Sequence, residues 1–189
     1  MLALKRGEVE LDLIPEVGGA IARLAFRGRN VLRPAPRGAT DPLETASFAL
    51  LPYCNRIAYG AFRFGGENFA LKPNFGAHPH CLHGHGWQRA WRVASVTPDS
   101  ALLKFEYEPG DWPWAYSTEQ SYTLTADGLR VELSLRNRGA RAMPISLGFH
   151  PYFPKTPATT LRASVGGMWE IHATSIPVRR VAAAQLIDL

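Results

Sequence analysis

The chain has 189 residues, a length that suits one domain with a sizeable hydrophobic core. Its 21 lysines and arginines outnumber 16 aspartates and glutamates, but the basic residues are scattered, so binding to nucleic acid is not expected. No segment is long and apolar enough for a signal peptide or a membrane span, and we expect a soluble, cytoplasmic protein.

Alternation of apolar and polar residues predicts β-strands along most of the chain. Residues 9–13 alternate first, and the proline-rich stretch 32–42 follows as a surface loop. Gly65-Gly66 predicts a hairpin, residues 103–107 form another alternating segment, and Asp127-Gly128 joins strands at 119–125 and 129–137. With no amphipathic helix or repeat, the pattern indicates an all-β, antiparallel β-sandwich forming a single domain over residues 1–189.

The stretch Ser146–Phe153 places His150 beside Pro151 at the mouth of an apolar strand, followed by two aromatic residues. A histidine held in this way can take or give a proton near neutral pH. Aromatic rings beside it suit the apolar faces of a sugar. The alternative is a buried histidine whose two nitrogens are satisfied by the backbone.

Four histidines and a cysteine lie close together between residues 78 and 85, which is typical of a metal site. They are His78, His80, Cys81, His83 and His85. The even spacing breaks after His80, and proline and glycine interrupt the run, so convergence of the rings is not expected. We therefore predict no metal, and a metal-dependent β-barrel remains the alternative.

Three ordered segments resemble the aldose 1-epimerase (galactose mutarotase) family. They are an Asn-Arg-Ile turn within Leu51–Leu71, a Leu-His-Gly motif within His78–Trp91, and the segment Gly148–Phe153. Trp112-Pro113-Trp114 is a weaker fourth match, and the resemblance extends from about Val9 to Pro177. It implies the family's β-supersandwich fold, with a sugar site on the concave face of the larger sheet and no cofactor.

The resemblance also implies roles for individual residues in interconverting the α and β anomers of a hexose or hexose 6-phosphate. It makes His150 the general acid at the ring oxygen and His83 a second histidine near the same oxygen. Arg56 becomes a donor to sugar hydroxyls, and Asn55 orients the Arg56 side chain. The aromatic ring that stacks on the sugar is that of Tyr152, Trp112 or Trp87. For each of these rings, packing in the core is the alternative.

The chain departs from the family pattern after Ser175–Val181, where the family's C-terminal third is missing. Family members place the general base, a glutamate, and a sugar-binding aspartate in that third. The acidic residues that remain after His150 are Glu170 and Asp188, and neither matches either role. The base is therefore unassigned, and the alternative to an isomerase is a non-catalytic carbohydrate-binding protein. A sugar is the expected partner, together with a second copy or another chain that covers the missing strands.

Overall fold

The computed structural model describes residues 1–162, 164–171 and 173–182. By its internal contacts the chain forms two compact units, Met1–Pro154 and residues 155–189. Almost all regular structure in the described residues is antiparallel β-strand, as the alternating sequence predicts. None of the helices found there is long and apolar enough to cross a membrane.

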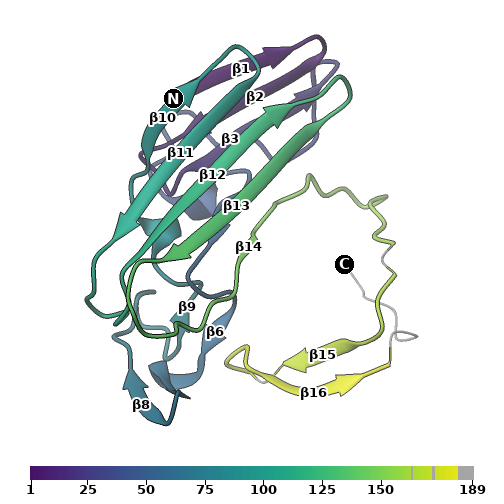
Figure 1. Cartoon of the computed structure of the whole chain (residues 1–189). Helices are drawn as coiled ribbons and strands as arrows, with labels where there is room; N and C mark the ends of the chain where they lie inside the picture. The colour runs from purple at the N-terminus through teal and green to yellow at the C-terminus, as the bar shows by residue number, and fades with distance from the viewer. Residues whose placement is uncertain (163, 172, 183–189) are drawn as a thin grey trace. The chain divides into compact units, whose positions relative to one another are not determined.

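The first sheet of the larger unit is a four-stranded antiparallel meander in the order β1-β2-β3-β4 (Figure 1). Its strands are β1 (Leu2–Arg6), β2 (Val9–Ile14), β3 (Ala20–Phe26) and β4 (Arg29–Asn30). Val9, Leu11 and Leu13 are almost completely buried, so the predicted apolar face of β2 is confirmed.

The second sheet has the order β10-β11-β12-β13. Its strands are β10 (Arg92–Val96), β11 (Ser100–Tyr107), β12 (Tyr116–Leu124) and β13 (Leu129–Asn137). β12 begins three residues earlier than its predicted start at Glu119, because Tyr116 and Thr118 continue its buried face. The hairpin between β12 and β13 is confirmed, with Leu124 opposite Leu129.

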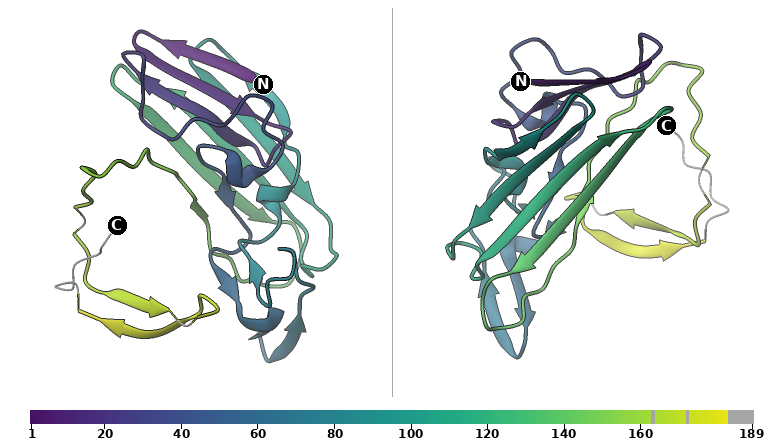
Figure 2. Two further views of the ribbon diagram at one scale, coloured as in Figure 1. Left: turned by 180° about the vertical axis from the view of Figure 1, so that it is seen from behind. Right: turned by 45° about the horizontal axis from the view of Figure 1, so that its top comes forward.

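The main core lies between these two sheets, which face each other in both views of Figure 2. Leu11 and Leu13 from the first sheet share one cluster with Leu103 and Tyr122 from the second. Tyr122 also ties the layers together, since its hydroxyl donates to the Gly19 carbonyl at 2.7 Å. Burying both sheet faces against each other is the dominant source of stability in this architecture.

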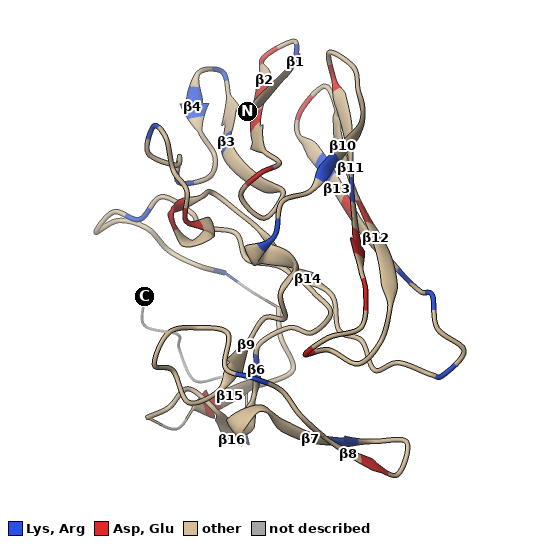
Figure 3. Ribbon diagram, turned by 90° about the vertical axis from the view of Figure 1, so that its left-hand side faces the viewer, with Lys and Arg blue, Asp and Glu red and all other residues tan. Residues whose placement is uncertain are grey.

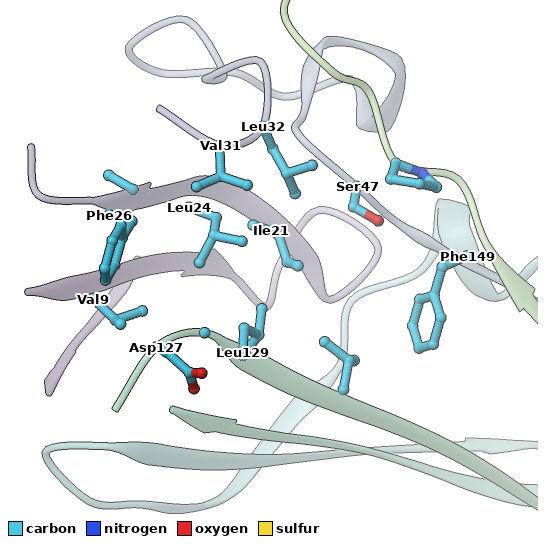
Figure 4. A pocket seen from close by; sticks show the side chains of 14 residues that line it. Val9, Ile21, Leu24, Phe26, Val31, Leu32, Ser47, Asp127, Leu129 and Phe149 are labelled. Carbon is cyan, nitrogen blue, oxygen red and sulfur yellow. The ribbon is translucent and has the colours of Figure 1, made fainter. Parts of the chain in front are cut away.

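An apolar cavity of about 320 Å³ opens between β3 and the start of β13 (Figure 4). Ile21, Leu24 and Phe26 line one side, and Leu129 lies on the other. β13 is the last strand of its sheet, so this side of the sandwich is less completely filled than its centre.

Shorter elements at the other end of the larger unit carry the sequence motifs. They are β5 (Ala49–Leu50), β6 (Arg56–Ile57), β7 (Ala61–Phe64), β8 (Glu67–Ala70), β9 (Cys81–Leu82), β14 (Gly148–Phe149) and three 3₁₀ turns, Pro42–Glu44, Ala58–Gly60 and Gly86–Gln88. The hairpin predicted at Gly65-Gly66 is confirmed, because Phe64 pairs with Glu67. β6 pairs with β9, and β5 pairs with β14.

The smaller unit contains one described hairpin, formed by β15 (Met168–Ile171) and β16 (Pro177–Val181). The Glu170 carboxylate accepts two hydrogen bonds from Arg179, at 2.9 and 3.0 Å. Trp169 is 58% exposed, so this hairpin has little hydrophobic core of its own. A two-stranded hairpin without a covered face is only marginally stable.

Basic and acidic residues are scattered over the ribbon rather than gathered into a stripe (Figure 3). Several arginines are paired with carboxylates, such as Arg23 with Glu10 at 2.9 Å and Arg138 with Glu108 at 2.7 Å. Phosphate-backbone binding requires clustered, unpaired cations. The lack of nucleic-acid binding stays a prediction from the sequence.

Candidate functional site

His83 lies in a turn whose backbone is fixed by unusual conformations. Both His83 and Asn55 have left-handed backbones, with φ of 56° and 60°, a region that histidine and asparagine enter more readily than most residues. The His83 N–H donates to the Asn55 carbonyl at 2.8 Å, and the Asn55 N–H donates to Nδ1 of His83 at 3.0 Å. Gly84 continues the turn with φ of 69°, where a Cβ would collide with the Leu51 carbonyl.

The hydrogen bond from Asn55 fixes the protonation pattern of the His83 ring. A backbone N–H can only donate, so Nδ1 of the neutral ring acts as acceptor and carries no proton. The proton of the neutral ring is therefore assigned to Nε2. His83 offers an Nε2–H donor to any ligand in front of it.

Backbone hydrogen bonds of His150 itself and of Tyr152 hold the strand segment that carries the imidazole. Its N–H donates to the Phe48 carbonyl at 2.9 Å, and the Tyr152 N–H donates to the Ala46 carbonyl at 2.9 Å. The imidazole stacks on Phe48 with ring centroids 5.0 Å apart and an interplanar angle of 15°. Nδ1 of His150 is buried without a partner among the described residues, which leaves Nε2 as the nitrogen open to a ligand.

The fold brings His83 and His150 together from two motifs far apart in sequence. Their ring centroids are 5.5 Å apart at an angle of 74°, and both residues are half-buried. This edge-to-face contact lets both rings address one small ligand. The predicted pair therefore meets in space.

Arg56 lies beside this pair because β6 pairs with β9, with Arg56 opposite Leu82. Its Nη1 donates to the Asn55 side-chain oxygen at 3.2 Å, which is the orienting contact that the sequence predicted for Asn55. Nε of Arg56 is buried and has no partner among the described residues. No carboxylate of the described chain forms an ion pair with Arg56, so its positive charge remains available to a ligand.

Both histidines are held in their neutral forms near neutral pH. Burial, followed by the nearby His150 and Arg56, lowers the pKa of His83 to about 4. Burial also lowers the pKa of His150, and Arg33 adds to that effect. To act as a general acid at neutral pH, His150 therefore requires a neighbouring negative charge that raises its pKa.

The predicted aromatic residues fall into two groups. The Tyr152 ring lies 4.8 Å from His150 and is half-buried, so it belongs to the histidine site. Trp112 and Trp87 are each only 2% exposed. Trp112 packs on Phe62 at 5.6 Å within the core. The sequence assignment of Trp112 to sugar binding is therefore corrected to core packing, because the side chain is buried among Tyr53, Phe62 and Trp114.

The remaining histidines have separate partners. Nε2 of His85 is 2.6 Å from the Tyr116 hydroxyl. Nδ1 of His80 accepts from the Tyr59 N–H at 3.0 Å, while Nδ1 of His78 accepts from the His80 N–H at 3.2 Å. Within residues 1–162, 164–171 and 173–182, no three His, Cys, Asp or Glu side chains are placed to hold a metal ion.

Of the two acidic residues that follow His150, only Glu170 lies among the described residues, and it is not placed as a base. The Glu170 carboxylate is occupied by Arg179 within the smaller unit. Asp188 lies outside the described residues. No carboxylate of the described chain is hydrogen-bonded to His83 or His150.

A family model for aldose 1-epimerases matches residues 1–186. The chain belongs to the aldose 1-epimerase family. It is 36% identical to YphB over 168 residues and 30% identical to YihR over 153 residues, both from Escherichia coli K12. These alignments cover 88% and 80% of the chain but only 56% and 49% of the relatives, so the chain spans about half of their length.

Solved structures agree on the fold. The chain superposes on a candidate aldose 1-epimerase of E. coli K12 with a TM-score of 0.90 and 32% identity, covering 98% of this chain and 62% of that one. A galactose mutarotase-like protein from Clostridium acetobutylicum gives a TM-score of 0.82 at 22% identity, with coverages of 97% and 61%, and supports the fold alone. The predicted family and fold class are confirmed, whereas the single domain over residues 1–189 stays a prediction.

Two residues next to His150 escaped the sequence analysis. Phe48 supplies the ring on which the imidazole stacks, and Arg33 lies over the Tyr152 ring at 4.1 Å. Phe48 lies in an ordinary apolar stretch, and Arg33 is one of many scattered arginines. No local pattern distinguishes either residue, because their positions depend on pairing between distant segments.

Proposed function

We propose that this chain provides the sugar-binding and histidine half of an aldose 1-epimerase site, which interconverts the anomers of a hexose or hexose 6-phosphate. The observation that carries this proposal is the contact between His83 and His150, with Arg56 beside them. Ring opening requires a proton donor at the ring oxygen and an acceptor at the C1 hydroxyl. After rotation about the C1–C2 bond, the two roles reverse.

Each residue has a task that follows from its contacts. His83 donates from Nε2 to a sugar oxygen, because its Nδ1 is occupied by the Asn55 N–H. His150 is the proton donor at the ring oxygen through Nε2. Arg56 donates to sugar hydroxyls while Asn55 holds its guanidinium, and Tyr152 borders the sugar.

In this proposal, the general base is a carboxylate that lies outside the described residues. Such a group would accept the C1 proton, and its negative charge would raise the pKa of His150 toward the neutral range. The lowered histidine pKa values of the described chain are those of a site without that charge.

The second candidate is a carbohydrate-binding protein without turnover. It is favoured by one observation, that no carboxylate of the described residues contacts the histidine pair. Donors alone suffice for binding, because each net hydrogen bond contributes about 1 kcal/mol to affinity. A few such contacts give a dissociation constant of about 1 mM or weaker.

Polarimetry and NMR distinguish the two functions. Fresh α-D-glucose, galactose and their 6-phosphates are followed by optical rotation with the protein and with His150→Gln. For an isomerase we expect loss of the positioned acid to slow mutarotation by about 10²- to 10⁴-fold. Sugar-dependent NMR shifts of His83 and His150 with no acceleration by the wild type would support the binding protein instead.

Arg56→Gln tests the sugar contact directly, and Arg63→Gln is its matched control. Arg63 lies on the exposed side of β7, so its replacement changes the net charge equally without touching the site. We expect Arg56→Gln to weaken hexose binding by about tenfold or more, the value of one charged hydrogen bond. Equal hexose affinity in both variants would exclude Arg56 from the site.

A further inference from the structure

Arg33 is anchored beside Tyr152 by contacts from two segments. Its backbone N–H donates to the Tyr152 carbonyl at 2.8 Å. Its Nη2 donates to the carbonyls of Leu43 and Thr45 at 2.7 and 3.0 Å. The guanidinium carbon lies 4.1 Å from the centroid of the Tyr152 ring, which is within the range of a cation–π contact.

These contacts continue to the histidine pair. The Tyr152 ring is 4.8 Å from the His150 ring, and the His150 ring is 5.5 Å from His83. Phe48 stacks on His150 at 5.0 Å, and its ring lies 6.3 Å from that of Tyr152. Arg33 thus contacts one ring of an aromatic cluster that holds the imidazole.

The charge of Arg33 is not neutralised by a carboxylate of the described chain. Its Nη2 bonds are to carbonyl oxygens, which align the guanidinium but carry no net charge. Asp41 and Glu44 are the acids of the same loop, and neither forms an ion pair with Arg33 among the described residues; one Asp41 carboxylate oxygen accepts from the Leu43 N–H instead. Partly buried charges are screened less than exposed ones, so the field of Arg33 reaches its neighbours.

We propose that Arg33 is a positioning residue of the histidine site, which holds Tyr152 against His150 and places a fixed positive charge behind the imidazole. A guanidinium suits this task because it is flat, always charged and able to donate to two carbonyls while stacking on a ring. Its contribution to catalysis rests on the proposed function, whereas its effect on His150 can be measured without any sugar.

The positive charge of Arg33 destabilises the protonated form of His150, so the protonated imidazole is a stronger acid. Burial is the larger cause of the lowered His150 pKa, and Arg33 adds to it. His83 and Tyr152 contact the His150 ring, with Arg56 near His83, and Arg33 and Asp41 near Tyr152. Cys54 lies against Gly148, two residues before His150. Of the two arginines, Arg33 lowers the His150 pKa.

The test is a pH titration of the histidine ring signals by NMR, with the His150 signal assigned through His150→Gln. We expect Arg33→Gln to move the His150 midpoint upward, because the opposing charge is gone. Arg33→Lys, which keeps the charge, should leave the midpoint below that of Arg33→Gln. If Arg33→Gln does not fold, Arg33→Met keeps the apolar stem and carries the same expectation.

Arg27→Gln is the matched control for net charge. Arg27 is an exposed arginine in the β3–β4 turn, where it pairs with Glu8 at 2.6 Å. Its replacement should not move the His150 midpoint. An unchanged midpoint in Arg33→Gln would overturn the proposal, and equal midpoints for the Gln and Lys variants would show that Arg33 acts through packing alone. Mutarotation rates do not enter this result, so an inactive chain leaves it intact.

Discussion

At the scale of single residues, hydrogen bonds to the ring nitrogens decide what each histidine can do. The Asn55 N–H occupies Nδ1 of His83 and directs its proton to Nε2. In His85, the Tyr116 hydroxyl occupies Nε2 instead, at 2.6 Å. Burial raises the pKa of Tyr116 and lowers that of His85 to about 4, so both groups are neutral and the tautomer of His85 sets which of them donates. Neighbouring histidines of one motif thus serve a ligand site and an internal hydrogen bond.

The neutral state of His83 and His85 makes the stability of the fold depend on pH. Their pKa values are about 4 in the folded chain and about 6.5 when unfolded, so the unfolded state binds more protons between these values. Stability is therefore fully present above about pH 6.5 and falls as the pH is lowered toward 4.

Urea unfolding at several pH values tests this prediction with His85→Gln as the variant. Glutamine can still accept from Tyr116 but has no proton to take up, so we expect a smaller loss of the free energy of unfolding between neutral pH and pH 4 than in the wild type. Parallel curves for both proteins would show that His85 does not contribute to the acid sensitivity.

At the scale of elements, short pairings rather than long strands place the site. β5 pairs with β14 to align His150, and β6 pairs with β9 to place Arg56 beside the His83 turn. The turn itself depends on Gly84, whose carbonyl also accepts from the Trp87 indole N–H at 3.0 Å. Trp87 belongs to a small buried hydrophobic cluster, so this hydrogen bond fixes the turn to that cluster.

Gly84→Ala tests how far the turn controls the site. The new methyl group would meet the Leu51 carbonyl in a left-handed backbone, so we expect destabilisation of about 2 kcal/mol or more. Hexose-dependent NMR shifts of His83 should also be lost. Gly65→Ala is the control, because Gly65 has φ of 59° with no atom within 4 Å of the added methyl group. It should cost about 1 kcal/mol and leave sugar binding unchanged.

At the scale of the whole molecule, one side of the larger unit presents an apolar opening. The cavity of about 320 Å³ in Figure 4 lies where β13 ends its sheet. Leu129, Val131, Leu133 and Leu135 along β13 are only partly buried. Open strand edges beside apolar surface favour pairing with another chain.

We therefore predict concentration-dependent association of the 189-residue chain, measured by sedimentation velocity. Val131→Lys places a charge in the cavity wall and should shift the protein toward monomer. Glu132→Lys is the control, because Glu132 lies on the exposed face of the same strand. This variant should not shift the protein toward monomer. A wild type that remains monomeric at all concentrations would contradict the prediction.

The sequence by itself determined most of the strands and the family, and it supplied the residues that we propose for the site. Period-two alternation fixed the buried faces of β2 and β12–β13, since side chains on a strand point to opposite sides in turn. The hairpin turns followed from glycine pairs and Asp-Gly, which tolerate the required backbone angles. The ordered motifs gave His83, His150 and Arg56 together.

Only the tertiary structure decided which neighbours these residues have. It placed Trp112 in the core and Tyr152 beside His150, although both are aromatic residues within motifs. It also brought Arg33 and Phe48 to the imidazole through pairings that join distant segments. Burial, protonation and stacking arise from such non-local contacts, and no local sequence pattern encodes them.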